Sequence, residues 1–144
     1  MQNLKVGGVP LHTALVHFPV VFWSLAMATD IAGLLTQSDI WWTVSWWSLA
    51  AGLVAGLAAA AVGFVDFVLL GRARHPAVGH VQNHMLVMLC AWAVFLVDLL
   101  VRDMHHPSAL SPWAVAVTAL GFVLLAIGAH LGGRLVYRHR VGID

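Results

Sequence analysis

Residues 11–19 read LHTALVHFP, and they open an apolar run that continues to Thr36. The hydrocarbon core of a bilayer is about 30 Å thick and takes about 20 helical residues to cross, so the run is long enough to span it. The stretch also carries His12, His17 and Pro19, none of which a helix facing lipid needs. The run therefore predicts a transmembrane helix whose beginning is irregular or functional.

The rest of the chain has the same apolar character. Of its 144 residues, 61% are hydrophobic and 9% are charged. A soluble domain of this size needs more polar surface, so the composition indicates an integral membrane protein in contact with the lipid bilayer. A formal net charge of +1 offers no basic surface for nucleic acid. The single cysteine excludes an internal disulfide.

Four apolar segments are long enough to span the membrane, and we expect helices over about residues 10–36, 42–70, 79–101 and 112–137. The sequence thus predicts an all-α, four-helix membrane bundle forming one domain over residues 1–144, with both termini on the same side and no repeat of clear period. Glycines at spacing four in the second and fourth segments predict that these two helices pack closely. Four tryptophans near the start of the second segment, at positions 41, 42, 46 and 47, indicate an interfacial belt.

The basic residues are distributed unevenly between the two sides. Only Arg102 falls on the side away from the termini; the others are Lys5, Arg72, Arg74, Arg134, Arg138 and Arg140. The positive-inside rule then predicts cytoplasmic termini. Asp98 and Arg102 are spaced i, i+4 and predict an ordinary helical ion pair on the outer side.

Each of the four segments contributes ionisable groups to the terminal half of the bundle. In chain order they are His12, His17, Asp66, His80, His84 and His130. Such groups are costly within a membrane and are candidates for a functional site. His80 and His84 share a helix face at spacing i, i+4. His12 and His17 lie about 140° apart on an ideal helix, so they can face one centre only if the helix is irregular, as Pro19 could make it.

Three stretches resemble one family: His12 to Pro19, His80 to His84, and Gly132 to His139. Together they are similar to the bacterial four-helix membrane family catalogued as domain of unknown function 2231, and the resemblance covers nearly the whole chain. It implies a compact four-span unit in a bacterial inner membrane. Some members adjoin or are fused to Rieske iron–sulfur domains, which points indirectly to electron transfer.

The first functional hypothesis is a membrane b-type cytochrome. Haem b would be held by His17 and His84, with His12 and His80 as a possible second pair. Arg72, Arg74 and Arg134 lie on the side where the haem propionates would need cations. The protein would relay electrons between quinone and a soluble redox partner. His17→Ala or His84→Ala should then each abolish cofactor retention, whereas His105→Ala should not.

Three alternatives remain open. One is a single zinc, copper or iron ion bound by His17, His80, His84 and His130 with Asp66 nearby. Another is a non-catalytic accessory subunit of a larger membrane complex, in which these groups form a buried hydrogen-bond network. The last is a proton or small-solute path, for which four helices are too few unless the chain forms a homo-oligomer. The sequence favours an electron carrier or an accessory subunit over an enzyme.

Overall fold

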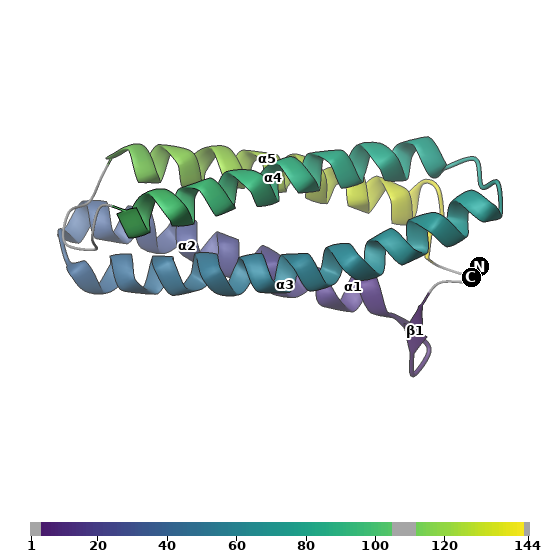
Figure 1. Ribbon diagram of the computed structural model, residues 1–144, viewed down its shortest axis with the longest axis horizontal. Coiled ribbons are helices and arrows are strands. Elements are labelled where there is room, and N and C mark those ends of the chain that lie inside the picture. The colour runs from purple at the N-terminus through teal and green to yellow at the C-terminus, as the bar shows by residue number, and fades with distance from the viewer. Residues whose placement is uncertain (1–3, 105–111, 143–144) are drawn as a thin grey trace.

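The computed structural model describes residues 4–104 and 112–142, without the side chains of residues 103 and 104. Two short strands, β1 (Lys5–Val6) and β2 (Val9–Pro10), precede the helices. The helices are α1 (Leu11–Leu15), α2 (His17–Thr36), α3 (Asp39–Arg72), α4 (Val78–Met104) and α5 (Pro112–Tyr137) (Figure 1). Four spans in the described residues, the first formed by α1 and α2 together, are long and apolar enough to cross a membrane. The predicted all-α four-helix architecture is confirmed.

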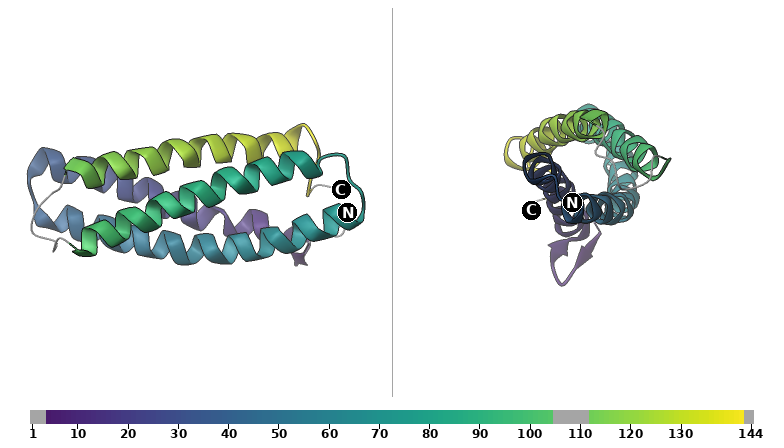
Figure 2. Two further views of the ribbon diagram at one scale, coloured as in Figure 1. Left: turned by 45° about the horizontal axis from the view of Figure 1, so that its top comes forward. Right: turned by 90° about the vertical axis from the view of Figure 1, so that its left-hand side faces the viewer.

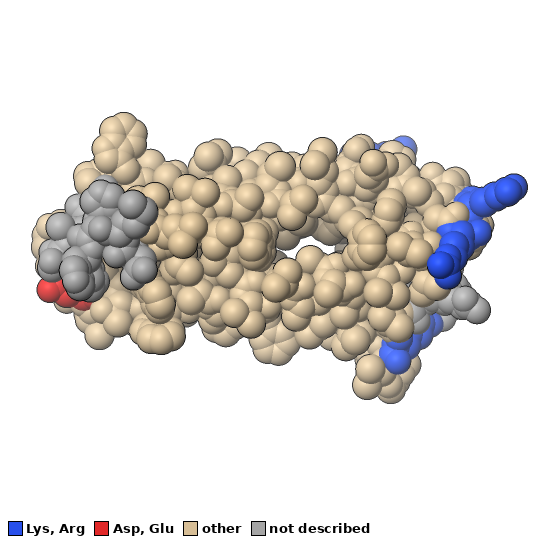
Figure 3. All heavy atoms as spheres, in the orientation of Figure 1, with Lys and Arg blue, Asp and Glu red and all other residues tan. Residues whose placement is uncertain are grey.

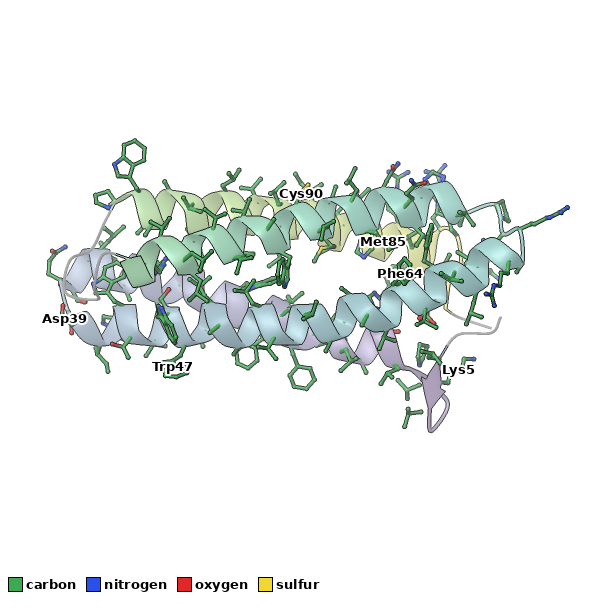
Figure 4. The ribbon with its side chains drawn as sticks, in the orientation of Figure 1. Lys5, Asp39, Trp47, Phe64, Met85 and Cys90 are labelled. Atoms are coloured by element: carbon green, nitrogen blue, oxygen red, sulfur yellow. The ribbon has the colours of Figure 1, made fainter. Side chains whose placement is uncertain are left out.

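The bundle consists of two helical hairpins, α2–α3 and α4–α5, which lie side by side (Figures 1 and 2). The end at which α1, α3, α4 and α5 meet is called the terminal end, and the opposite end is the far end. Lys5 and Asp39 mark these two ends in Figure 4. The more extensive contacts lie within each hairpin, and α3 and α4, like α2 and α5, make the smaller contacts between the hairpins.

The prediction that the second and fourth transmembrane helices pack closely is wrong. These helices are α3 and α5, which are not among the extensively contacting pairs of the described residues. Their glycines instead receive large side chains from neighbouring helices: Trp23 lies on Gly52, and Phe95 lies on Gly121. The small residues therefore make room for rings rather than for a second backbone.

The first transmembrane segment is interrupted where the sequence predicted an irregularity. α1 ends at Leu15, and α2 begins at His17. Pro19 has no N–H group to donate to the carbonyl of Leu15, so a regular helix cannot continue through this point. His12 therefore lies on α1, and His17 is the first residue of α2.

The structure also contains an N-terminal hairpin that the sequence reading missed. Lys5 pairs with Pro10, and Val6 with Val9. The turn residues Gly7 and Gly8 have φ values of 58° and 83°. Two consecutive positive φ values are typical of a type I′ turn, for which a Gly-Gly pair is a recognised signal. The hairpin lies beside the start of α1 at the terminal end (Figure 1).

The predicted tryptophan belt is divided between the surface and the core. Trp47 is 65% exposed and points away from α3 (Figure 4). Trp42 is instead buried, with its ring over Gly33 of α2. Gly33 thus lets the far ends of α2 and α3 approach each other.

A layer of aromatic rings crosses the bundle near its middle. Trp23 and Phe95 stack across the two hairpins with their ring centroids 4.5 Å apart. Trp92 joins them and donates a hydrogen bond of 3.0 Å from Nε1 to the carbonyl of Leu53. At the terminal end, Leu70, Val81 and Leu135 form a separate apolar cluster.

The two hairpins repeat each other in their contacts, although the sequence alone shows no clear period. Three pairs in the first helix of each hairpin are separated by 72 residues: His12 and His84, Trp23 and Phe95, Asp30 and Arg102. The first two of these pairs contact positions on the following long helix that are separated by 69 residues: Gly52 and Gly121, Ala59 and Gly128, Gly63 and Gly132. Two of the pairs, Trp23 with Phe95 and Asp30 with Arg102, contact each other directly. The hairpins are therefore related by an approximate two-fold axis along the bundle.

Candidate functional site

Two histidines occupy equivalent, partly buried positions in the terminal half of the bundle. The Nδ1 atom of His12 lies 2.9 Å from the carbonyl oxygen of Ala59 on α3. The Nδ1 atom of His84 lies 3.0 Å from the carbonyl oxygen of Gly128 on α5. A carbonyl oxygen can only accept, so each Nδ1 carries a hydrogen. In the neutral ring, each Nε2 therefore carries no hydrogen, and its lone pair can bind a metal.

Each imidazole ring lies against a glycine of the neighbouring helix. A Cβ atom on Gly63 would lie 2.7 Å from Cε1 of His12, and one on Gly132 would lie 3.1 Å from Cε1 of His84. Gly63 is four residues after Ala59, and Gly132 is four residues after Gly128, so each ring spans one helical turn of its neighbour. The approximate two-fold axis relates His12 on α1 to His84 on α4. We call His12 and His84 the histidine pair.

The bundle is hollowed between its hairpins in the same half. Figure 3 shows an opening that passes through the molecule near its middle, on the side of the terminal end. On α3, the aromatic layer lies against Gly56 and the histidine pair lies at Gly63, which places them about 10 Å apart along the axis. Protein interiors are normally close-packed, so this opening is the largest departure from ordinary packing visible in that view.

The other predicted ligands do not join the histidine pair. His17 is exposed, and its Nδ1 lies 3.3 Å from the carbonyl of Ala14 on its own segment. His17 lies about 140° from His12 around an ideal helix, and Val16 between them keeps helical φ and ψ values of -63° and -20°, so His17 faces outward while His12 faces inward. His80 is exposed and stacks on His139, while His130 is exposed on α5. Asp66 accepts a hydrogen bond of 3.0 Å from the backbone N–H of Leu4, which ties the N-terminal segment to α3.

The predicted cations lie at the terminal end, where the lysine and arginine side chains gather in Figure 3. Arg72 and Arg74 are exposed at and just after the end of α3. Arg134 lies in a surface pocket between α4 and α5, together with His80 and Asn83. Phe18 and Phe64 are more than half exposed. His105 and His106 lie outside the described residues.

A metal site with several protein ligands has no counterpart in the described part of the chain. No group of three or more His, Cys, Asp or Glu side chains comes together there in a geometry that could hold an ion. Among the described residues, no third side chain of these types joins the two histidines of the pair. The predicted four-histidine arrangement with Asp66 is thus not assembled.

A buried charge network lies in the far half of the bundle. Arg102 of α4 donates to Asp98 Oδ1 at 3.0 Å, to Asp30 Oδ1 of α2 at 2.9 Å and to Ser45 Oγ of α3 at 3.1 Å. It also donates to Thr118 Oγ1 of α5 at 2.7 Å. Both aspartates, Ser45 and Thr118 are buried. Every long helix therefore contributes a side chain to one network, which we call the arginine network.

The hydrogen bonds of Thr118 bear on the charge of this network. Its Oγ1 lies 2.6 Å from Asp30 Oδ2 and 2.7 Å from Asp98 Oδ2. A hydroxyl group has one hydrogen to donate, so it cannot donate to both carboxylates. A proton on one of the two carboxyl groups would supply the second hydrogen bond. The network would then carry no net charge, since Arg102 balances the remaining carboxylate.

Sequence reasoning found only part of this network. It paired Asp98 with Arg102 and treated the pair as ordinary, and the contact is present. It did not connect Asp30, Ser45 or Thr118 to the pair. The available signal was depth: these residues come from segments predicted to span the membrane and fall at the same level from the far end.

Comparison with known proteins identifies one family. The sequence model of a family described as "Predicted membrane protein (DUF2231)" matches residues 8–144. No curated protein and no solved structure matches the chain.

Proposed function

The chain belongs to the DUF2231 family of predicted membrane proteins, and from this premise we propose that it is a membrane b-type cytochrome that binds haem through His12 and His84. One observation carries the proposal: two imidazoles in equivalent positions of the two hairpins each fix Nδ1 on a backbone carbonyl and leave Nε2 free. Histidines that bind metals are commonly oriented in this way, because a hydrogen bond at one nitrogen selects the tautomer and raises the basicity of the other.

The number of donors favours haem over a bare ion. Structural zinc sites take four protein ligands and catalytic ones take three, whereas haem supplies four nitrogens of its own and needs only axial ligands from the protein. Haem would supply reversible one-electron chemistry at the iron. The approximate two-fold axis relates the two donors, so a group bound between them would contact both hairpins alike.

The surroundings of the histidine pair fit this role. The opening between the hairpins in Figure 3 lies in the same half of the bundle as the pair and reaches the outside, so it offers a lateral path of entry. The stacked Trp23 and Phe95 separate this region from the arginine network. Arg72 and Arg74 stay candidates for the propionate groups, because they lie at the terminal end.

We further propose that the termini face the cytoplasm of a bacterial cell, with the protein in its inner membrane. The concentration of basic residues at the terminal end supports this orientation. The histidine pair would then lie in the inner half of the membrane, within reach of a quinone and of a soluble redox partner on the cytoplasmic side.

The arginine network favours a second candidate, an accessory subunit without a cofactor. A network that joins all four long helices can hold a scaffold in one arrangement without any chemistry. In that case the histidine pair would serve only as interhelical hydrogen bonds.

Absorption spectroscopy separates the two candidates. The full chain, expressed with haem available and purified in detergent, should show the absorption bands of a bis-histidine haem, and the reduced form should show a sharpened α band. His12→Ala and His84→Ala should each abolish these bands. His17→Ala is the matched control, because it removes the exposed histidine of the same segment, and it should retain them.

Two outcomes would contradict the cytochrome. One is a colourless wild-type protein that stays colourless after haem is added. The other is equal loss of haem in all three variants, which would show that the bands do not report the histidine pair. Metal analysis of the same sample would detect a bound ion that gives no colour.

A further inference from the structure

A small pocket at the terminal end takes no part in the proposed cytochrome. It lies between the first turns of α4 and the last turns of α5, and it is lined by His80, Asn83, Leu131, Arg134, Leu135 and His139. The rings of His80 and His139 stack with their centroids 4.3 Å apart. The stack connects α4 to the segment that follows α5.

The segment after α5 is held over this pocket by its backbone. The N–H of His139 donates to the carbonyl of Arg134 at 3.2 Å, and the N–H of Val141 donates to the carbonyl of Leu135 at 3.0 Å. Arg140 between them has a φ of 51°. A left-handed residue just after a helix, with such backward hydrogen bonds, is a helix-ending motif that fixes the direction of the chain. His139 is therefore positioned by the fold.

The polar side chains of the pocket are hydrogen-bond donors. Arg134 has five N–H groups, Asn83 has two, and each imidazole has at least one. In the described part of the chain, none of these side chains has a protein hydrogen-bond acceptor, and no carboxylate lines the pocket. The pocket thus presents several donors to whatever enters it.

The electrostatic environment is positive from every element around the pocket. Packing against the bundle end lowers the pKa of His139 from its ordinary value, and positive neighbours lower it further. These neighbours are His80 on α4, Arg138 and Arg134 around the end of α5, and His75 in the loop before α4. A bound anion would offset this repulsion and favour the imidazolium form.

The position of the pocket suits a lipid headgroup. The spans of α4 and α5 begin at Val78 and end at Tyr137, so the pocket lies at the level where the hydrocarbon core ends. Leu131 lies about one helical turn further into the bundle than Arg134 and gives the pocket an apolar side, and Arg134 and His139 give it a polar side. A phosphate joined to acyl chains matches this division.

We propose that this pocket binds the phosphate group of an anionic membrane lipid, with Arg134 and the stacked His80 and His139 as its donors. The site does not depend on haem. Binding should strengthen as the pH falls through the range in which free histidine titrates, near about 6.5, because a protonated His139 adds one positive charge to the site.

The test uses the full chain in maltoside micelles, which contain no phosphate. Short-chain phosphatidylglycerol or inorganic phosphate is added, and the imidazole signal of His139, assigned with His139→Gln, is followed by NMR across pH. The lipid should raise the pKa of His139. Arg134→Gln should weaken lipid binding about tenfold, as expected for the loss of a charged hydrogen bond.

Arg72→Gln is the matched control. It removes an exposed arginine at the same end of the bundle but outside the pocket, and it should leave lipid binding within about twofold. Equal weakening by Arg72→Gln and Arg134→Gln would overturn the proposal in favour of diffuse surface charge. An unchanged pKa of His139 with the lipid would also overturn it, and a response to inorganic phosphate alone would overturn the assignment to a lipid.

Discussion

Replacing Arg102 with glutamine tests whether the arginine network holds the four helices together. The substitution removes the only positive charge within hydrogen-bonding distance of Asp30 and Asp98 in the described residues, and both carboxyl groups are buried. Removing one partner of a buried ion pair typically costs about 3–5 kcal/mol, which corresponds to two to nearly four powers of ten in the folding equilibrium. We expect a loss in this range.

The assay is reversible unfolding in mixed micelles by a denaturing detergent, followed by the fluorescence of the seven tryptophans. Arg72→Gln is the control, because this arginine is exposed at the last turn of α3. It should change the free energy of unfolding by no more than about 0.5 kcal/mol.

Two further variants separate the loss of charge balance from the loss of packing. Asp30→Asn leaves one arginine and one carboxylate, so it should cost far less than Arg102→Gln. Arg102→Gln combined with Asp30→Asn and Asp98→Asn removes all three charges and should regain a large part of the lost stability. The reasoning is refuted if Arg102→Gln and Arg72→Gln unfold alike, or if neutralising both aspartates gives no recovery.

Three more predictions concern the histidines and their glycine contacts. Gly63→Ala should destabilise the protein by about 1–3 kcal/mol, because the new Cβ would lie 2.7 Å from the ring of His12. Gly71→Ala, which meets nothing within 4 Å, should be neutral or stabilising in the same unfolding assay. The pKa of His139 should lie below about 6.5 in the absence of phosphate, and Arg138→Gln should raise this pKa. The folded protein then binds fewer protons at His139 than the unfolded chain, so the contribution of His139 to stability is lost as the pH falls through that range. An NMR titration in which Arg138→Gln leaves the pKa of His139 unchanged would contradict this prediction. His84→Gly should lose haem and should recover the haem absorption bands when free imidazole is added. His17→Gly is the control, and it should keep these bands without imidazole.

Transmembrane architecture follows from local composition, and for that reason the sequence was sufficient to predict it. Apolar segments longer than 20 residues, separated by polar or glycine- and proline-containing turns, have few alternatives to four spanning helices. The break near Leu15 was also predictable, because a proline acts on the carbonyl four residues before it. The predicted bounds of α5 agree with the structure, and α3 is longer than predicted because Asp39 and Arg72 continue the helix at its two ends.

Partners across the bundle could not be predicted, because they depend on how each helix is rotated about its axis. His17 was expected to face His84 by depth alone, but His12 is the residue that faces inward, whereas His17 lies about 140° away around the segment and faces outward. For the same reason the contact between Asp30 and Arg102 was not predicted, although the two residues lie at the same depth in the bundle. Glycines at spacing four were consistent with close helix contact or with room for a large ring, and only the positions of Trp23 and Phe95 distinguish the two.

The approximate two-fold relation between the hairpins has a consequence for the origin of the chain. Positions 30 and 102 are equivalent, yet one carries an aspartate and the other an arginine, and they bind each other. In a homodimer of separate two-helix peptides, these positions would hold identical residues and place like charges face to face. Gene duplication and fusion remove that constraint, since each copy can then mutate independently. Two halves within one polypeptide can therefore carry opposite charges at positions 30 and 102, which two identical two-helix peptides could not.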